Sequence, residues 1–197
     1  MGEESAVQQA RQRARGGWWE DGLTEILTGT VLMYIGGVGY LKETATGNAA
    51  TAWTSLWVVG TVLLPLLGQR ILRWLKGRWV WPYAGYVRPR RRSHVLLPLG
   101  ALMLLAAVAV LLGWLGLWAT GLTLGLFLAV GIGSQVPRFR WLGGLALLAG
   151  LGLDRSPLPP IQGFFLLLAV VGLLLLGTGL LTWHRFRQSL REVAHGG

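Results

Sequence analysis

Long apolar stretches separated by short polar ones dominate the pattern of this chain. Six stretches consist almost entirely of apolar residues and glycine, namely 23–41, 49–67, 95–117, 121–136, 141–153 and 161–183. An α-helix needs roughly 20 mostly apolar residues to cross the hydrocarbon core of a bilayer. The pattern therefore predicts an all-α integral membrane protein, a bundle of about six transmembrane helices.

The fourth and fifth stretches are the shortest of the six, so each predicts either a short tilted helix or one arm of a re-entrant hairpin. Both alternatives leave the last helix with the same direction. The chain then divides into an N-terminal tail (1–22), two helices (23–67), a basic loop (68–94), four further helical stretches (95–183) and a C-terminal tail (184–197).

Charge is scarce and very unevenly placed. The chain has 18 Lys and Arg against 8 Asp and Glu, and only 13% of its residues are charged. If six segments cross, every Lys and Arg except Lys42 and Arg155 falls on one side of the membrane. Because cytoplasmic loops are enriched in cations, this split predicts a multi-pass protein of the cell (inner) membrane with both termini in the cytoplasm. Acidic Glu20 and Asp21 precede the first stretch, so we expect no signal peptide.

The composition also narrows the chemistry. The chain has no cysteine, which excludes disulfides, thiolate catalysis and cysteine-ligated metals. The three histidines, His94, His184 and His195, lie at inner boundaries or in the tail, and no metalloprotease, phosphate-loop or serine-hydrolase motif is present. We therefore expect no catalytic residue, no metal and no cofactor, and a protein that is not an enzyme.

Small residues form stripes at helical spacing. The fourth stretch carries Gly121, Gly125, Ala129 and Gly133, each four positions apart. Helices in lipid associate through such residues, because small side chains let the backbones approach closely. The stripe predicts a helix-packing face, within one chain or between chains. Around the first stretch, glycines recur at positions 22, 29 and 36.

Glu25 is the one acidic residue inside a long apolar stretch, and it shares the glycine face of the first helix. Asp21 precedes it by one turn. A carboxylate in a membrane helix marks a candidate site, because its burial is costly without a partner. We expect Glu25 to be ionised and paired with a cation of the 70–78 segment. Proton or cation coupling and a lipid-headgroup site are the alternatives.

The loop after the second stretch mixes cations with aromatic residues. Its cations are Arg70, Arg73, Lys76, Arg78, Arg88, Arg90, Arg91 and Arg92. Its first part predicts an amphipathic continuation of the second helix at the membrane surface, before Pro82 and Gly85 end the helix. We expect these cations to contact anionic lipid headgroups at the inner face or a membrane-protein partner; nucleic acid is the least favoured partner.

Two segments together resemble an uncharacterised group of bacterial multi-pass membrane proteins. Residues 18–25 read WWEDGLTE and residues 81–87 read WPYAGYV. They are similar to a W-x-E-D-G-L-x-E start and a later Y-P-R-x-G-Y-V motif, with Trp81 in place of Tyr and Tyr83 in place of Arg. The resemblance covers few residues and implies no activity. It implies that the acidic start and the basic loop belong together at the inner face.

Three classes of function remain. Few polar groups and many small-residue faces favour a non-enzymatic scaffold, anchor or accessory subunit of a membrane complex, with a membrane protein or a second copy of the chain as its partner. Six helices in about 200 residues also resemble the substrate-binding component of energy-coupling-factor transporters, with the glycine-broken fourth and fifth stretches as its site. A lipid-modifying enzyme ranks last, because no acid–base pair or metal set is present.

Overall fold

A computed structural model describes residues 21–79, 101–102, 104–105, 108–110, 112–113, 115–132 and 136–195. Regular structure in this part of the chain is helical throughout. The elements are α2 (Leu23–Thr44), α3 (Asn48–Trp79), α6 (Leu117–Leu126), the π-helical segment η1 (Phe127–Ile132), α7 (Arg138–Asp154) and α8 (Pro160–His195). The residues described between 101 and 110 are also helical.

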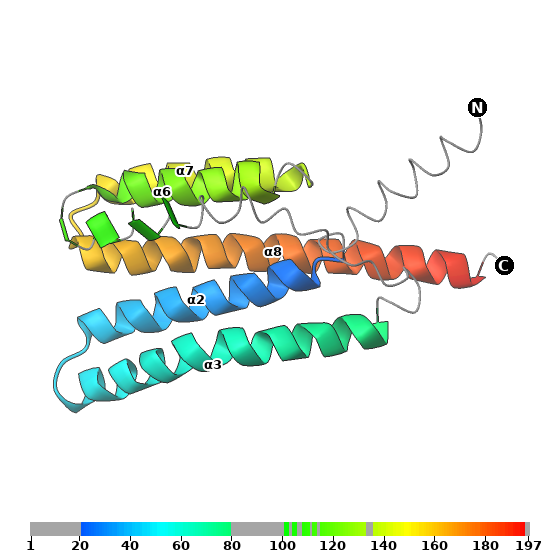
Figure 1. Ribbon diagram of the computed structural model, residues 1–197, viewed down its shortest axis with the longest axis horizontal. Helices are drawn as coiled ribbons and strands as arrows, with labels where there is room; N and C mark the ends of the chain where they lie inside the picture. Colours follow the sequence, from blue (N-terminus) through cyan, green and yellow to red (C-terminus); the bar gives the residue numbers. More distant parts are fainter. Residues whose placement is uncertain are drawn as a thin grey trace.

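Helix α8 lies at the centre of the arrangement. Helix α2 packs along one side of α8, and α3 packs on the side of α2 that faces away from α8 (Figure 1). On the other side of α8, α6, η1 and α7 form a hairpin. Two helices, α3 and α8, are long and apolar enough to cross a membrane. At 1.5 Å per residue, a helix of 32 residues such as α3 is about 48 Å long.

Several helix ends differ from those expected from the apolar pattern. Helix α3 continues to Trp79, past the predicted end of the second stretch at 67, and α8 continues to His195, through most of the predicted C-terminal tail. The chain turns at Gly113, where φ is 74°, and α6 already begins at Leu117. Apolar patterning locates the hydrophobic part of a helix, but hydrogen bonding and packing carry the helix on through polar residues.

Glycines bring α2 and α8 into backbone contact. A Cβ atom added to Gly29 would lie 2.5 Å from the backbone nitrogen of Leu176, and one added to Gly179 would lie 2.7 Å from that of Ile26. Gly36 and Gly172 face the opposite backbone in the same way. Such approaches leave no room for any side chain, so these glycines define the α2–α8 seam.

A second seam joins α6 and η1 to α7. A Cβ on Gly121 would lie 2.9 Å from the Cα of Gly150, and one on Gly125 would lie 2.6 Å from the carbonyl oxygen of Gly143. Ala129 faces Gly143 one turn further along. Three residues of the predicted stripe thus lie against α7 in the same chain. Gly133 lies outside the described residues.

The hairpin packs on α8 through aliphatic side chains. Leu128, Phe139 and Leu142 of the hairpin side are buried with Leu167 and Val171 of α8 in one continuous apolar cluster.

Helix α3 is joined to α2 by hydrogen bonds from aromatic side chains to backbone carbonyls. The Tyr34 hydroxyl donates to the carbonyl oxygen of Leu56 at 2.6 Å, and the Trp57 indole donates to that of Ile35 at 3.0 Å.

Candidate functional site

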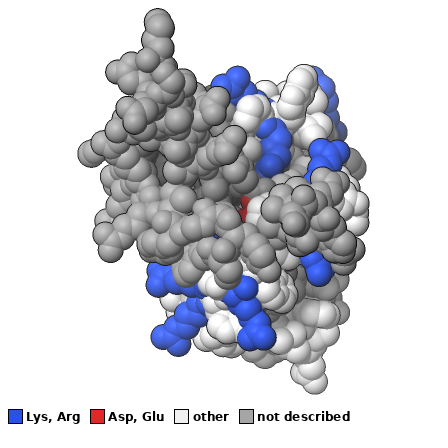
Figure 2. All heavy atoms as spheres, turned by 90° about the vertical axis from the view of Figure 1, so that its right-hand side faces the viewer, with Lys and Arg blue, Asp and Glu red and all other residues white. Residues whose placement is uncertain are grey.

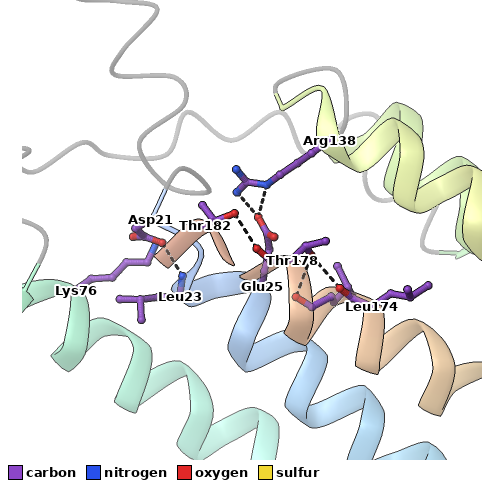
Figure 3. A network of polar contacts seen from close by, with 9 residues as sticks. Asp21, Leu23, Glu25, Lys76, Arg138, Leu174, Thr178 and Thr182 are labelled. Carbon is purple, nitrogen blue, oxygen red and sulfur yellow. Dashed lines mark hydrogen bonds and ion pairs between the residues drawn. The ribbon is translucent and has the colours of Figure 1, made fainter. Parts of the chain in front are cut away.

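Buried charges gather at one end of the bundle, where α2 and α7 begin and where α3 and α8 run past them (Figure 3). Asp21, Glu25 and Lys76 are each at most 1% exposed. Figure 2 views this end of the molecule, where Lys and Arg side chains surround a small acidic area. Among the described residues this end carries two ion pairs, and each joins a different pair of helices.

The first pair connects the start of α2 to the extension of α3. The Lys76 Nζ lies 2.8 Å from Asp21 Oδ2, and both side chains are 1% exposed. Asp21 Oδ1 also accepts a hydrogen bond of 3.0 Å from the backbone N–H of Leu23. That N–H belongs to the first turn of α2, whose donors lack helical partners, so Asp21 caps the helix while it holds Lys76.

Local backbone and apolar packing explain why this pair is buried. Gly22 has φ of 74°, a conformation that other residues rarely adopt, and its missing side chain leaves room for the backbone of α8 at Trp183. Leu23 and Leu72 form a buried apolar cluster beside the pair, and Trp183 and Phe186 pack against that cluster. Water therefore has little access to the two charged groups.

The second pair connects α2 to the start of α7. Arg138 donates from Nε to Glu25 Oε1 at 2.8 Å, and its Nη2 also contacts Oε1. Glu25 is fully buried, whereas the Arg138 side chain is 30% exposed. The predicted partner of Glu25 within 70–78 was therefore wrong. Lys76 of that segment binds Asp21 instead, because α3 passes the start of α2, while the N-terminus of α7 lies above Glu25.

Hydroxyl groups of α8 complete the surroundings of Glu25. Thr178 lies beside the carboxylate, and Thr178 and Thr182 both donate to backbone carbonyls of the preceding turn of α8 (Figure 3). The second carboxylate oxygen of Glu25 makes no hydrogen bond within the described part of the chain.

Burial is the main influence on Asp21. Loss of water raises the pKa of the Asp21 carboxyl, and the ammonium group of Lys76 opposes that rise through charge and a hydrogen bond. Among the described residues at this end, each of the two buried carboxylates is paired with one cation. Within the described ranges, no group of three or more His, Asp or Glu side chains forms a metal-binding cluster. The arrangement is suited to holding helices together.

The other described cations of the predicted loop lie apart from this network. Arg70, Arg73 and Arg78 are exposed on α3, whereas Lys76 is turned inward. Arg88, Arg90, Arg91 and Arg92 lie outside the described residues. Sequence reasoning missed Arg138 as the partner of Glu25. The positive-inside pattern, which places Arg138 on the same side as Glu25, is the signal that pointed towards it.

Comparison of the chain with protein-family models, with curated proteins and with solved structures finds no match. The arrangement of the described residues is therefore the basis for the function proposed below.

Proposed function

We propose that this protein is a non-enzymatic, multi-pass protein of the cell (inner) membrane that acts as a scaffold, anchor or accessory subunit of a membrane complex. Its six crossings place both termini in the cytoplasm, with anionic lipid headgroups around the inner face. The ion pairs at the starts of α2 and α7 lie at that face and hold the two halves of the bundle together.

The observation that carries this proposal is the apolar surface of α3. In the most apolar window of this helix only 6% of the residues are buried inside the molecule. Leu56, Val59, Leu63 and Leu66 are between 47% and 60% exposed. Soluble monomers rarely expose apolar patches larger than a few hundred Å². Lipid or another membrane protein is the environment that suits such a face.

The interior supports a structural role. The space between the hairpin and α8 is filled by aliphatic and aromatic side chains, and the buried charged residues of the described part lie at one end. A carrier of polar molecules needs polar groups near the middle of the membrane. An apolar, closely packed interior suits a protein that binds partners through its surface.

Cross-linking from the α3 face tests the accessory role. A photo-reactive amino acid at Leu63 should give an adduct of one defined mass with a membrane protein in native membranes. The matched control is Leu148, a 64% exposed leucine on α7. Lipid adducts alone at both positions would contradict the accessory role and leave α3 as a lipid-facing helix.

Cysteine labelling tests the six crossings, because the native chain has no cysteine. Single cysteines at Ala6, Thr46 and Ala194 are treated with an impermeant reagent from outside the cell. Thr46 is chosen because it is exposed, whereas the neighbouring Gly47 has φ of 60° and tolerates side chains poorly. Only position 46 should react. Reaction of position 6 or 194 would contradict the topology.

A transporter related in architecture to energy-coupling-factor substrate-binding components is the second candidate. Two observations favour it: the π-helical segment η1 within the hairpin, and a carboxylate oxygen of buried Glu25 that accepts no hydrogen bond from the described residues. π-Helical turns are frequent at functional sites. A flux across proteoliposomes that Glu25→Gln abolishes without a change in melting temperature would place this candidate first.

A further inference from the structure

We infer that the outward face of the α3 extension is a binding site for the headgroup of an anionic phospholipid. The site consists of Arg70, Arg73 and Trp74, with Arg78 one turn further along, and is named here the α3 headgroup face. This inference deepens the proposed function, since it assigns the lipid contact to particular residues of one helix.

The helix geometry separates the cations of α3 into two sets. Arg70, Trp74 and Arg78 are four positions apart and share one side of the helix, and Arg73, which is also exposed, lies between that side and the side that carries Lys76. Leu72 and Lys76 lie on the opposite side, where both are buried against α2. Lys76 is thus engaged internally, and the arginines point away from the bundle.

The α3 headgroup face continues a strip of exposed apolar residues. Leu63, Leu66 and Leu67 precede Arg70 on the same side of the helix and are 47%, 60% and 48% exposed. An occupant of the whole strip must therefore be apolar along one part and anionic at the end. A phospholipid has this form, whereas a nucleic acid or an acidic soluble peptide lacks the apolar part.

The position along α3 agrees with the thickness of the headgroup layer. If the apolar part ends at Leu67, Arg70 lies about 4.5 Å and Trp74 about 10 Å further along the axis. The headgroup region on each side of a bilayer is about 5–8 Å thick. The long side chain of Arg78 can reach back towards the same layer, as cationic side chains do at membrane surfaces.

The charges on the α3 headgroup face favour the binding of an anion. Helix α3 contains no Asp or Glu, so no carboxylate on the same helix neutralises the arginines. Arg78 lies over the ring of Trp74, with its guanidinium carbon 5.8 Å from the ring centroid. Trp74 is 60% exposed, which suits an indole ring at the outer, polar edge of the membrane interface.

The ion pair between Lys76 and Asp21 fixes the position of the α3 headgroup face relative to the rest of the bundle. It fixes the rotation of the α3 extension, because Lys76 must face Asp21 of the α2 start. Trp79, at the end of α3, stacks on Trp183 of α8 with ring centroids 5.9 Å apart. The arginines of the α3 headgroup face are therefore held in one orientation before any lipid binds.

The test compares lipid selectivity of the full-length protein and two double variants in vesicles. Spin-labelled phosphatidylglycerol and phosphatidylcholine report the relative affinity of each lipid for the protein. Arg70→Gln/Arg73→Gln changes the α3 headgroup face. Arg185→Gln/Arg187→Gln is the matched control, since it removes the same charge from exposed positions on α8 at the same end.

Wild type and the α8 control are expected to prefer phosphatidylglycerol. The Arg70→Gln/Arg73→Gln variant should lose about fivefold of that preference while its melting temperature stays unchanged. Absence of a preference in wild type, or an equal loss in both variants, overturns the inference. Displacement of the labelled lipid by soluble glycerophosphoglycerol at constant ionic strength also overturns it, because a site for free phosphate would then explain the binding.

These results are independent of the accessory role. A lipid preference that depends on Arg70 and Arg73 supports the inference even when cross-linking from Leu63 finds no protein partner. Conversely, a protein adduct at Leu63 together with no lipid preference would retain the proposed function and remove the α3 headgroup face.

Discussion

The glycine seams and the charged end join helices by opposite means. In the seams, the absence of side chains allows backbones to touch, as at Gly121 and Gly150. At the charged end, long side chains reach across from one helix to another, as from Lys76 to Asp21. The seams join the closest helix pairs, α2 with α8 and α6 with α7. The ion pairs tie α3 and the hairpin to the start of α2.

This difference has energetic consequences. A seam gains dispersion energy at many atoms and has no tolerance for added volume. A buried ion pair loses much of its Coulomb energy to the cost of removing two charges from water. Seams therefore account for stability, whereas the ion pairs select which helices meet and in which rotation. Substitutions in the seams and in the ion pairs separate these roles.

Filling the α2–α8 seam should have the largest effect. A Cβ on Gly172 would lie 2.8 Å from the carbonyl oxygen of Gly29, so Gly172→Leu must force the two helices apart. We expect a loss of about 3 kcal/mol or more, measured as a large fall in melting temperature in detergent. Gly177→Leu is the control on the same helix, because nothing lies within 4 Å of its Cβ position. Equal effects of both variants would show that the seam is not the cause.

Removing one partner of the Asp21–Lys76 pair should have the next largest effect on stability. Lys76→Met leaves a carboxylate that is 1% exposed without its ammonium partner, at a cost of about 3 kcal/mol, since uptake of a proton by the carboxyl limits the loss. The double variant Asp21→Asn/Lys76→Met retains an acceptor for the Leu23 N–H and removes both charges. Its melting temperature should return close to that of wild type. A double variant as unstable as Lys76→Met would show that the unpaired charge is not what destabilises the protein.

The Glu25–Arg138 pair should respond asymmetrically. Arg138→Gln leaves a fully buried carboxylate, whereas Glu25→Gln leaves an arginine that is 30% exposed and can turn to water. We expect Arg138→Gln to cost more than Glu25→Gln, which should cost about 1–2 kcal/mol. Both should speed hydrogen exchange in the first turn of α7. The reverse order of melting temperatures would contradict the burial of Glu25.

Gly37→Ala should have the smallest effect on stability, and it should stabilise the protein where the other substitutions destabilise it. Nothing lies within 4 Å of a Cβ at Gly37, so this glycine belongs to neither seam. Alanine is favoured over glycine inside a helix by up to about 1 kcal/mol, and a small rise in melting temperature is expected. Its neighbour Gly36 faces the backbone of α8, so Gly36→Ala should lower the melting temperature. Similar shifts for both variants would contradict the assignment of Gly36 to the seam.

Periodicity along the chain was sufficient to predict which residues face a neighbouring helix. Gly22, Gly29, Gly36 and Glu25 share one face of α2 by spacing alone, and the structure buries all four. The stripe of Gly121, Gly125 and Ala129 likewise meets α7. Spacing is informative here because the 3.6-residue helical repeat turns it into angular position without reference to any partner.

The identity of each partner was decided only by the tertiary structure. Glu25 is paired with Arg138, which is 113 positions away, although the same end of the bundle offers several other cations (Figure 2). Helix α3 continues past its apolar part and turns one side towards Asp21. Lys76 lies on that side and is buried, whereas Arg70 and Arg73 are exposed. Sequence alone determined an apolar, all-helical chain with charges at the helix ends and glycines on one face. Which charges meet depends on the order and rotation of helices in the bundle, and contacts between residues far apart in the chain set both.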